Sequence, residues 1–241
     1  PLSLVPQERS SRNVLSHNMP LKLYKTDASP PVRAVLMTAE ILKLNYEPIE
    51  VNIATGDNVK PEYLEKNPLH SIPMLEDGDF ILVDSHAIIT YLTTKYGAEK
   101  RAELYPNDVA LKATVDQRLF FEASSIFPAI KAMVKGIIGG KEPGASPQQI
   151  AAANDVYDVL DKYLQKTDYV ACNHLTVADV SCVAAVTSMD LVVPVEAKYE
   201  KLNAWLEKLK GEEWYKKANE PGLAQLRGYL DFALKNNTGK S

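Results

Sequence analysis

Cysteine is scarce in this chain, which has only Cys172 and Cys182 among its 241 residues. Two cysteines cannot build a disulfide framework or a four-ligand zinc site. We therefore expect no bound metal. The low cysteine content also favours a reducing compartment, so we expect a cytoplasmic protein.

Long apolar runs and an excess of basic residues are missing as well. No apolar stretch reaches the length of about 18 residues that a membrane-spanning helix needs, so we expect no membrane association. The 27 basic and 31 acidic residues give a net charge of −4, which argues against nucleic-acid binding. With 46% hydrophobic and 24% charged residues, the composition fits a globular protein of one large or two modest domains.

Residues 1–18 differ from the rest of the chain because they carry no helical or alternating apolar pattern. They lack the apolar core of about 7–15 residues that defines a secretory signal. We expect a disordered extension or a remnant of cloning, and a cleaved transit segment is the alternative. This segment is left out of the predicted fold.

The stretch from Leu21 to Gly97 alternates between strand and helix patterns. Alternating apolar residues predict strands, apolar residues at helical spacing predict helices, and Asp77-Gly78 provides a hairpin turn. Ser85 is the expected N-cap of the last helix, which Gly97 closes. The predicted strands are 21–25, 46–53, 72–75 and 80–83, and the predicted helices are 32–44, 61–66 and 85–96. These elements predict an α/β domain over residues 19–98.

After a polar linker at 99–107, the sequence predicts an all-helical domain over residues 108–241. Gly139 to Pro147 is rich in glycine and proline and separates the first two helices. Thr176 and Asp179 form a capping-box pattern, which predicts a helix start rather than a substrate contact. The predicted helices are 108–138, 147–165, 176–189, 198–209 and about 221–235.

Ser29 follows the first strand and precedes Pro30, which suits the first position of a helix. The free N–H groups of that helix start would stabilise an anion such as a thiolate. A plain capping role for Ser29 is the alternative.

Two later turns also carry groups that could bind a ligand. Ile72-Pro73 stands directly before a strand and suggests a cis proline that leaves the backbone of Ile72 free to pair with an extended peptide. An ordinary loop with a trans proline is the alternative. Asp84 and Ser85 begin a helix, where a carboxylate and an ammonium group could both bind, although capping alone would also explain Ser85.

The motifs Ser29-Pro30-Pro31-x-Arg33, Asn67-Pro68-x-His70-x-Ile72-Pro73 and Asp84-Ser85-His86-Ala87-Ile88 together resemble the cytosolic glutathione transferases of the insect delta and epsilon classes, with epsilon favoured. The resemblance extends from about Met19 to Leu234. It implies a thioredoxin-like α/β domain followed by an all-α domain, in a homodimer that uses glutathione as co-substrate.

The resemblance also implies roles for single residues. Ser29 would hold the glutathione sulfur as a thiolate, and it would stabilise the thiolate rather than act as a base. The main chain of Ile72, beside cis Pro73, would bind the cysteinyl backbone, and Asp84 with Ser85 would bind the γ-glutamyl group. The remaining glutathione-binding residues implied are Asn58, His70, Ser71 and His86.

The resemblance to the glutathione transferases implies that the second substrate, the electrophile, binds between the two domains. Phe127, Ile130, Lys131, Val134 and Ile138 form one stripe of a helix, which by spacing alone would equally fit a buried core. The resemblance assigns this stripe to the substrate pocket, and an apolar pocket suits a hydrophobic electrophile. Thr26 and Ala28 would form the opposite lip, and Leu223 with Leu226 would close the top.

The sequence thus predicts a glutathione S-transferase that conjugates glutathione to hydrophobic electrophiles, with roles in detoxification and insecticide resistance. A non-catalytic carrier of hydrophobic ligands is the alternative from another class. A glutathione-dependent isomerase or peroxidase is a third reading, because both reactions use the same thiolate.

Overall fold

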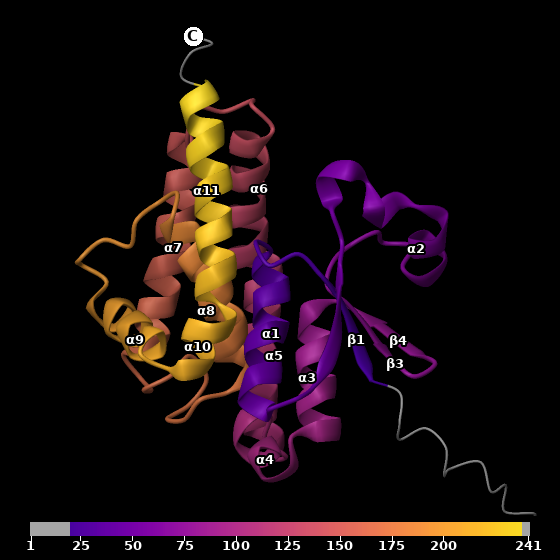
Figure 1. The fold of residues 1–241 in the computed structure, drawn as a ribbon. Helices are drawn as coiled ribbons and strands as arrows, with labels where there is room; N and C mark the ends of the chain where they lie inside the picture. The colour runs from indigo at the N-terminus through magenta and orange to yellow at the C-terminus, as the bar shows by residue number, and fades with distance from the viewer. Residues whose placement is uncertain (1–19, 238–241) are drawn as a thin grey trace, which may run out of the picture.

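The computed structural model describes residues 20–237, so the predicted extension at 1–18 lies outside the described residues. A small sheet with three helices comes first in the chain, and a larger group of helices follows it (Figure 1). Helices α1 (Pro30–Leu42) and α3 (Ser85–Tyr96) lie between the sheet and the later helices, whereas α2 (Pro61–Lys66) lies on the side away from them.

The sheet has the strand order β2-β1-β3-β4, with β1 (Leu21–Lys25) parallel to β2 (Tyr46–Glu50). Strands β3 (Met74–Asp77) and β4 (Phe80–Val83) form an antiparallel hairpin, and β3 also pairs antiparallel with β1. The predicted strands therefore exist, but two of them have different bounds.

Two local features explain these differences. The predicted strand 46–53 ends early because the Asn52 side chain accepts hydrogen bonds from the next backbone N–H groups and starts the 3-10 turns η1 (Ile53–Thr55) and η2 (Asp57–Val59). The predicted strand 72–75 begins only at Met74, because Pro73 has no N–H to donate to a ladder.

Beyond residue 107 the described chain contains helices and no strand. The predicted helix 108–138 is instead α5 (Val109–Phe121), the π-helical segment η4 (Glu122–Ile126) and α6 (Phe127–Ile138). Pro128 explains the change of winding, since it cannot donate the backbone hydrogen bond that a continuous α-helix requires.

The remaining helices follow the predictions with small shifts at their ends. Two short helices were not predicted: α4, which follows the 3-10 turn η3 (Ala98–Lys100) inside the predicted linker, and α10, which has six residues. The helices are α4 (Arg101–Leu104), α7 (Pro147–Leu164), α8 (Val177–Asp190), α9 (Glu200–Lys210), α10 (Glu213–Ala218) and α11 (Glu220–Asn237).

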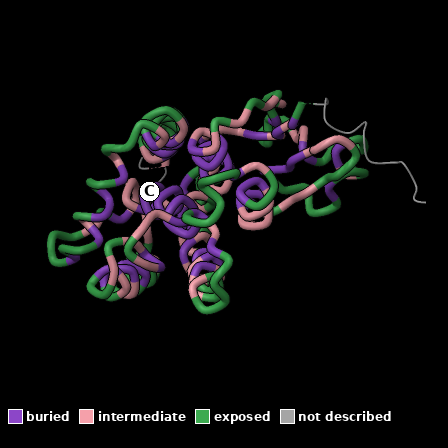
Figure 2. Tube along the Cα trace, turned by 90° about the horizontal axis from the view of Figure 1, so that it is seen from below, coloured by how far each residue is buried: buried purple, intermediate pink, exposed green. Residues whose placement is uncertain are grey.

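Helix α8 lies in the middle of the core, where nearly all of its side chains are buried. It packs against α1 from the first part of the chain and against α5 and α6 from the second. Buried residues accordingly gather in the middle of the molecule, with exposed residues on the outer loops (Figure 2). The predicted capping box at its start is present, and the buried Asp179 carboxylate there also accepts hydrogen bonds from Val170 N–H and Trp205 Nε1.

Candidate active site

The register of the sheet brings the three sequence motifs to one end of it. Tyr24 of β1 pairs with Met74 of β3, which in turn pairs with Val83 of β4. Ser29 lies just beyond the end of β1, the Ile72–Pro73 bond directly precedes Met74, and Asp84 directly follows Val83. The three turns therefore lie side by side, although they are up to 55 residues apart in the chain.

Ser29 is the N-cap residue of α1, with extended backbone angles and Pro30 as the first helical residue. Its backbone carbonyl accepts from Arg33 N–H at 3.0 Å, but its side chain makes no capping hydrogen bond. The hydroxyl is half-buried at the positive end of the helix dipole. It is therefore available to donate a hydrogen bond to an anion, and plain capping does not account for it.

The peptide bond between Ile72 and Pro73 is cis, as predicted. Among residues 20–237, neither the backbone N–H nor the backbone C=O of Ile72 has a hydrogen-bond partner. Such groups are rarely left unpaired in a folded protein. The turn therefore offers one donor and one acceptor to an extended ligand.

Side-chain hydrogen bonds fix the backbone of the loop before this turn. Tyr63 Oη and Asn67 Nδ2 both donate to the carbonyl of Ser71, at 2.6 and 2.7 Å. Asn58 is buried, and its Nδ2 donates to the carbonyl of His70 at 2.7 Å. His70 and Ser71 are themselves exposed, so their side chains can reach a ligand while the loop backbone stays fixed.

The third turn differs from the prediction, because Asp84 and not Ser85 is the N-cap of α3. Asp84 Oδ1 accepts hydrogen bonds from the backbone N–H groups of His86 and Ala87. Its φ of 75° lies in the left-handed region that non-glycine residues avoid and that often marks a functional position. Within the described residues, Asp84 Oδ2 has no partner, whereas Ser85 is buried as the first residue of the helix.

His86 joins this turn to the helical part of the molecule. Its Nδ1 lies 3.1 Å from Asp84 Oδ1, and its Nε2 lies 2.6 Å from Oε2 of Glu122. Burial opposes protonation of His86, but the hydrogen bonds to the two carboxylates outweigh it and raise the pKa to about 9. His86 is therefore charged at neutral pH and forms a bridge between two carboxylates.

Glu122 is a functional candidate that the sequence did not identify. It lies in η4, it is buried, and burial raises the pKa of its carboxyl group while His86 lowers it. Nothing in the pattern around Glu122 predicts this contact, because its partner is 36 residues away in the chain.

The residues predicted to bind the second substrate fall into two groups. Ile130, Leu226 and Ala28 are buried, and Leu226 packs in the same small cluster as Ala28. Ala28 and Leu226 are buried where the first turns of α11 pack on the loop before Ser29, whereas Ile130 lies in the main core. All three are covered by other parts of the chain in this structure, and their part in a substrate pocket stays a prediction.

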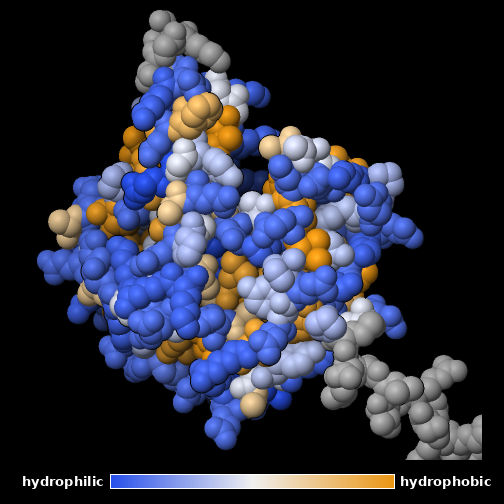
Figure 3. Space-filling view, viewed as in Figure 1, coloured by the Kyte–Doolittle hydropathy of each residue, from blue (hydrophilic) through white to orange (hydrophobic). Residues whose placement is uncertain are grey.

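The other group lies nearer the surface. Phe127, Val134, Leu223 and Thr26 are half-buried, and Lys131 and Ile138 are exposed. The Thr26 hydroxyl donates to the carbonyl of Val51 and so supports the loop. The surface is hollowed between the upper part of α6 and α11 and the segment before α2, with apolar side chains on both sides (Figure 3).

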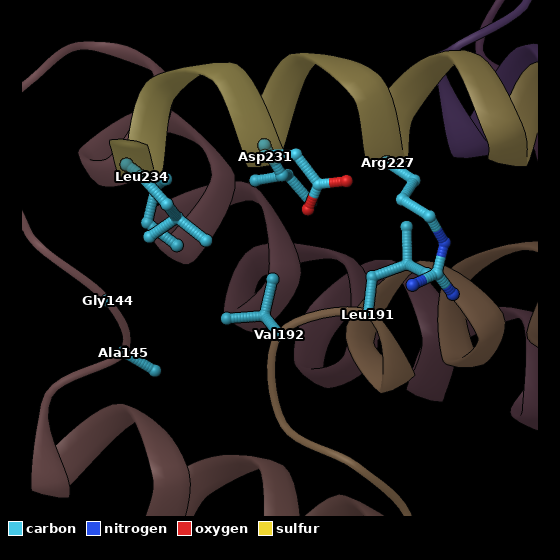
Figure 4. Close-up of a pocket in the computed structure, with 9 residues that line it drawn as sticks. Gly144, Ala145, Leu191, Val192, Arg227, Asp231 and Leu234 are labelled. Carbon is cyan, nitrogen blue, oxygen red and sulfur yellow. The ribbon is translucent and has the colours of Figure 1, made fainter. Parts of the chain in front are cut away.

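A separate cavity of about 90 Å³ lies on another side of α11. Its walls come from α6, α11, the loop after α6 and the end of α8, and Arg227 and Asp231 stand at its rim (Figure 4). None of the predicted site residues lines it. It is therefore distinct from the three turns.

Residues 20–237 contain no group of three or more His, Cys, Asp or Glu side chains that could hold a metal ion. Within the same range, no helix combines the length and the apolar character needed to cross a membrane.

Comparison with known proteins gives the family. The sequence profile described as "Glutathione S-transferase, N-terminal domain" matches residues 23–100, and that of "Glutathione S-transferase, C-terminal domain" matches residues 143–208. Glutathione S-transferase 1 of Manduca sexta is 43% identical over 207 residues, which cover 85% of this chain and 94% of that protein. The chain belongs to the glutathione S-transferase family.

Solved structures of glutathione transferases agree with this assignment. An epsilon-class enzyme from the housefly, Musca domestica, superposes with a TM-score of 0.85 at 38% identity, covering 88% of this chain and 98% of that one. A homologue from Drosophila mojavensis with bound glutathione also gives 0.85 at 38% identity, covering 89% and 97%. The predicted family and the predicted fold class, thioredoxin-like followed by all-α, are confirmed.

Proposed function

We propose that the protein is a serine-type glutathione S-transferase whose glutathione site is formed by the three turns at one end of the sheet. The observation that carries this proposal is the row Tyr24–Met74–Val83, which places Ser29, cis Pro73 and Asp84 together. The relative with bound glutathione has the same fold and supports this assignment.

Each turn matches one part of the tripeptide. The Ser29 hydroxyl donates a hydrogen bond to the cysteinyl sulfur and, with the N-terminus of α1, stabilises the thiolate. The unpaired backbone groups of Ile72 bind the cysteinyl backbone as one strand binds another. Asp84 Oδ2 accepts from the γ-glutamyl ammonium, and the N–H and hydroxyl of Ser85 bind its carboxylate.

Four neighbouring residues complete the site. His70 and Ser71 are exposed beside cis Pro73 and are placed to contact the glycyl end. Asn58 holds the backbone of His70, so its contribution is to fix the loop. His86 acts on glutathione through Asp84, since its two ring nitrogens are already bonded to carboxylates.

The second substrate in this proposal is a hydrophobic electrophile that binds beside α6, near Phe127, Lys131, Val134 and Ile138. The apolar side chains around the hollow support this (Figure 3). Conjugation of such compounds would serve detoxification in the cytoplasm, including resistance to insecticides.

We also propose that the protein is a homodimer. Several large apolar side chains are exposed on the loop before β3, on the edge strand β4 and on α5: Leu69, Phe80, Ile81, Val109 and Phe120. Contact with a second copy of the chain would bury them.

Replacing Ser29 by alanine tests the assigned role. A hydrogen bond to a charged group contributes roughly 1.5–3 kcal/mol, so we expect Ser29→Ala to lose about 10- to 100-fold in kcat/KM for conjugation of glutathione to an aryl halide. The pKa of the bound thiol should rise by about one to two units, measured by the ultraviolet absorbance of the thiolate.

The control is Ser29→Thr, which keeps the hydroxyl and should retain most of the activity. Full activity and an unchanged thiol pKa in Ser29→Ala would show that the role is wrongly assigned. Tight binding of apolar ligands by the unaltered protein, without glutathione turnover, would favour the carrier function instead.

A further inference from the structure

Arg33 is a fully buried cation, one helical turn after Ser29 on α1. Its Nη1 donates to Asn219 Oδ1 at 2.5 Å, and its Nη2 donates to the hydroxyl of Ser188 and to the carbonyl of Ala184 at 3.3 Å. Its Nε has no hydrogen-bond partner within the described chain. Every group that holds the guanidinium is therefore neutral.

This arrangement is unusual for a buried charge. Buried charged groups are normally paired with an opposite charge, because removing an ion from water costs several kcal/mol. Burial lowers the pKa of Arg33 to about 10, which still leaves the side chain protonated at neutral pH. No acidic side chain among residues 20–237 forms a salt bridge with it. A full positive charge thus remains in the interior without a counter-ion.

An unpaired charge differs from an ion pair in one physical respect, since its field is not cancelled by a neighbour. Arg33 and Ser29 lie four residues apart across the first turn of α1, and Arg33 N–H donates to the Ser29 carbonyl. The guanidinium and the positive end of the helix dipole therefore act in the same direction on an anion at Ser29. We propose that the unneutralised charge of Arg33 stabilises the thiolate of glutathione bound at Ser29.

Arg33 acts through its field and does not touch the reacting sulfur. In general, a unit charge about 10 Å away changes the pKa of another group by about one unit when the effective dielectric constant is about 20. The inference rests on the proposed function, because it needs glutathione at Ser29.

Within residues 20–237, the charged side chains nearest to Arg33 on the neighbouring elements are paired with one another, as Lys217 is with Glu40 and Lys210 with Glu207. Helix α8 presents Ser188 and the carbonyl of Ala184, and α11 presents Gly222. Tyr215 of α10 is neutral at pH 7, because burial raises its pKa. The carboxylate of Asp27, in the loop before Ser29, is paired with Lys25.

The decisive variant is Asn219→Asp, which keeps the shape of the side chain and gives Arg33 a counter-ion. We expect the pKa of the bound glutathione thiol to rise by about one unit, with stability against urea equal to or above that of the unaltered protein. Conjugation should be slower by up to about 10-fold below the thiol pKa and should return to the unaltered rate above it.

Ser188→Ala is the matched control, since it removes a neutral hydrogen bond and leaves the charge in place. We expect lower stability with an unchanged thiol pKa. Arg33→Met removes the charge and should raise the thiol pKa as Asn219→Asp does, whereas Arg33→Lys should keep it. If Arg33→Met does not fold, the comparison of the thiol pKa between Asn219→Asp and Ser188→Ala still tests whether the charge of Arg33 stabilises the thiolate.

An unchanged thiol pKa in Asn219→Asp would overturn the inference, and so would a loss of rate that persists at all pH values. These outcomes are distinct from failure of the proposed function. If the unaltered protein shows neither a bound thiolate nor conjugation, the proposed function fails. If it shows both and Asn219→Asp behaves identically, only the inference about Arg33 fails.

Discussion

At the scale of single residues, the half-buried cation His86 and the fully buried cation Arg33 are held in opposite ways. His86 lies between the carboxylates of Asp84 and Glu122, so its charge is compensated on both sides. Arg33 is held by an amide, a hydroxyl and a carbonyl, so its charge is not compensated. The His86 arrangement stabilises a contact between the two parts of the chain. In the proposal above, the Arg33 arrangement leaves the electric field of the guanidinium uncancelled at Ser29.

The raised pKa of His86 makes stability depend on pH. The pKa of His86 rises from an ordinary value of 6.5 to about 9 in the folded protein, so the stabilisation is complete below pH 6.5 and is lost as pH rises through 9. The unfolding free energy of the unaltered protein, relative to His86→Asn, should fall by about 2–3 kcal/mol over this window. Urea unfolding at a series of pH values measures it.

Glu122→Gln is the companion variant, because it removes one carboxylate and keeps the size of the side chain. It should shrink the pH-dependent difference, since the pKa of His86 then falls toward its ordinary value. A difference that stays constant between pH 6.5 and 9 would mean that His86 does not carry the charge assigned to it.

The sequence predicts the residues whose role depends on their neighbours in the chain. Ser29 precedes a proline at a helix start, and Ile72-Pro73 precedes a strand, so both turns stand out as candidates, and the resemblance to the glutathione transferases implies the cis bond that the structure contains. The contacts of Glu122 and Arg33 could not be predicted in this way, although Arg33 belongs to the first motif. Their partners lie 36 and as many as 186 residues away, and only the packed fold brings them together.

At the scale of elements, the first turn of α11 positions the loop that carries Ser29. An ideal Cβ on Gly222 would lie 2.0 Å from the carbonyl oxygen of Asp27 and 2.7 Å from Cδ of Arg33. Only glycine allows this close approach of a helix to a loop. The packing of α11 and the position of Ser29 are therefore coupled.

Gly222→Ala tests this coupling. The added methyl group must displace the backbone of Asp27, so we expect a loss of about 1–3 kcal/mol in the unfolding free energy and a lower kcat/KM for conjugation. Urea unfolding and steady-state kinetics measure the two effects.

The same helix provides the control. A Cβ on Gly228 would meet nothing within 4 Å, so Gly228→Ala should stabilise the protein by about 0.5–1 kcal/mol with unchanged kinetics. If the two variants behave alike, α11 does not position the Ser29 loop.

Element boundaries show where periodicity stops being informative. The apolar spacing over 108–138 fits one helix, because a π-helical segment changes the winding without interrupting the apolar pattern. Helix α10 has only six residues, too few to give a periodic signal. The N-cap of α3 was placed one residue late, since Asp and Ser are both good capping residues and only the φ of Asp84 distinguishes them.

At the scale of the whole molecule, the proposed homodimer explains apolar side chains that the single chain leaves exposed. Phe120 on α5 is 70% exposed, and Phe232 on α11 is 72% exposed. The two are thus matched in residue type, secondary structure and exposure, but only Phe120 belongs to the proposed interface.

Replacing each phenylalanine by lysine tests whether Phe120, but not Phe232, lies in the dimer interface. Phe120→Lys would bury an unpaired ammonium group in an apolar interface, so we expect the dimer dissociation constant to weaken by at least about 100-fold. Phe232→Lys should leave the dimer intact, because its side chain stays in water. Analytical ultracentrifugation over a range of concentrations measures both. A monomeric unaltered protein, or equal dissociation of the two variants, would place the interface elsewhere or remove it, and the exposed apolar residues would then need another partner.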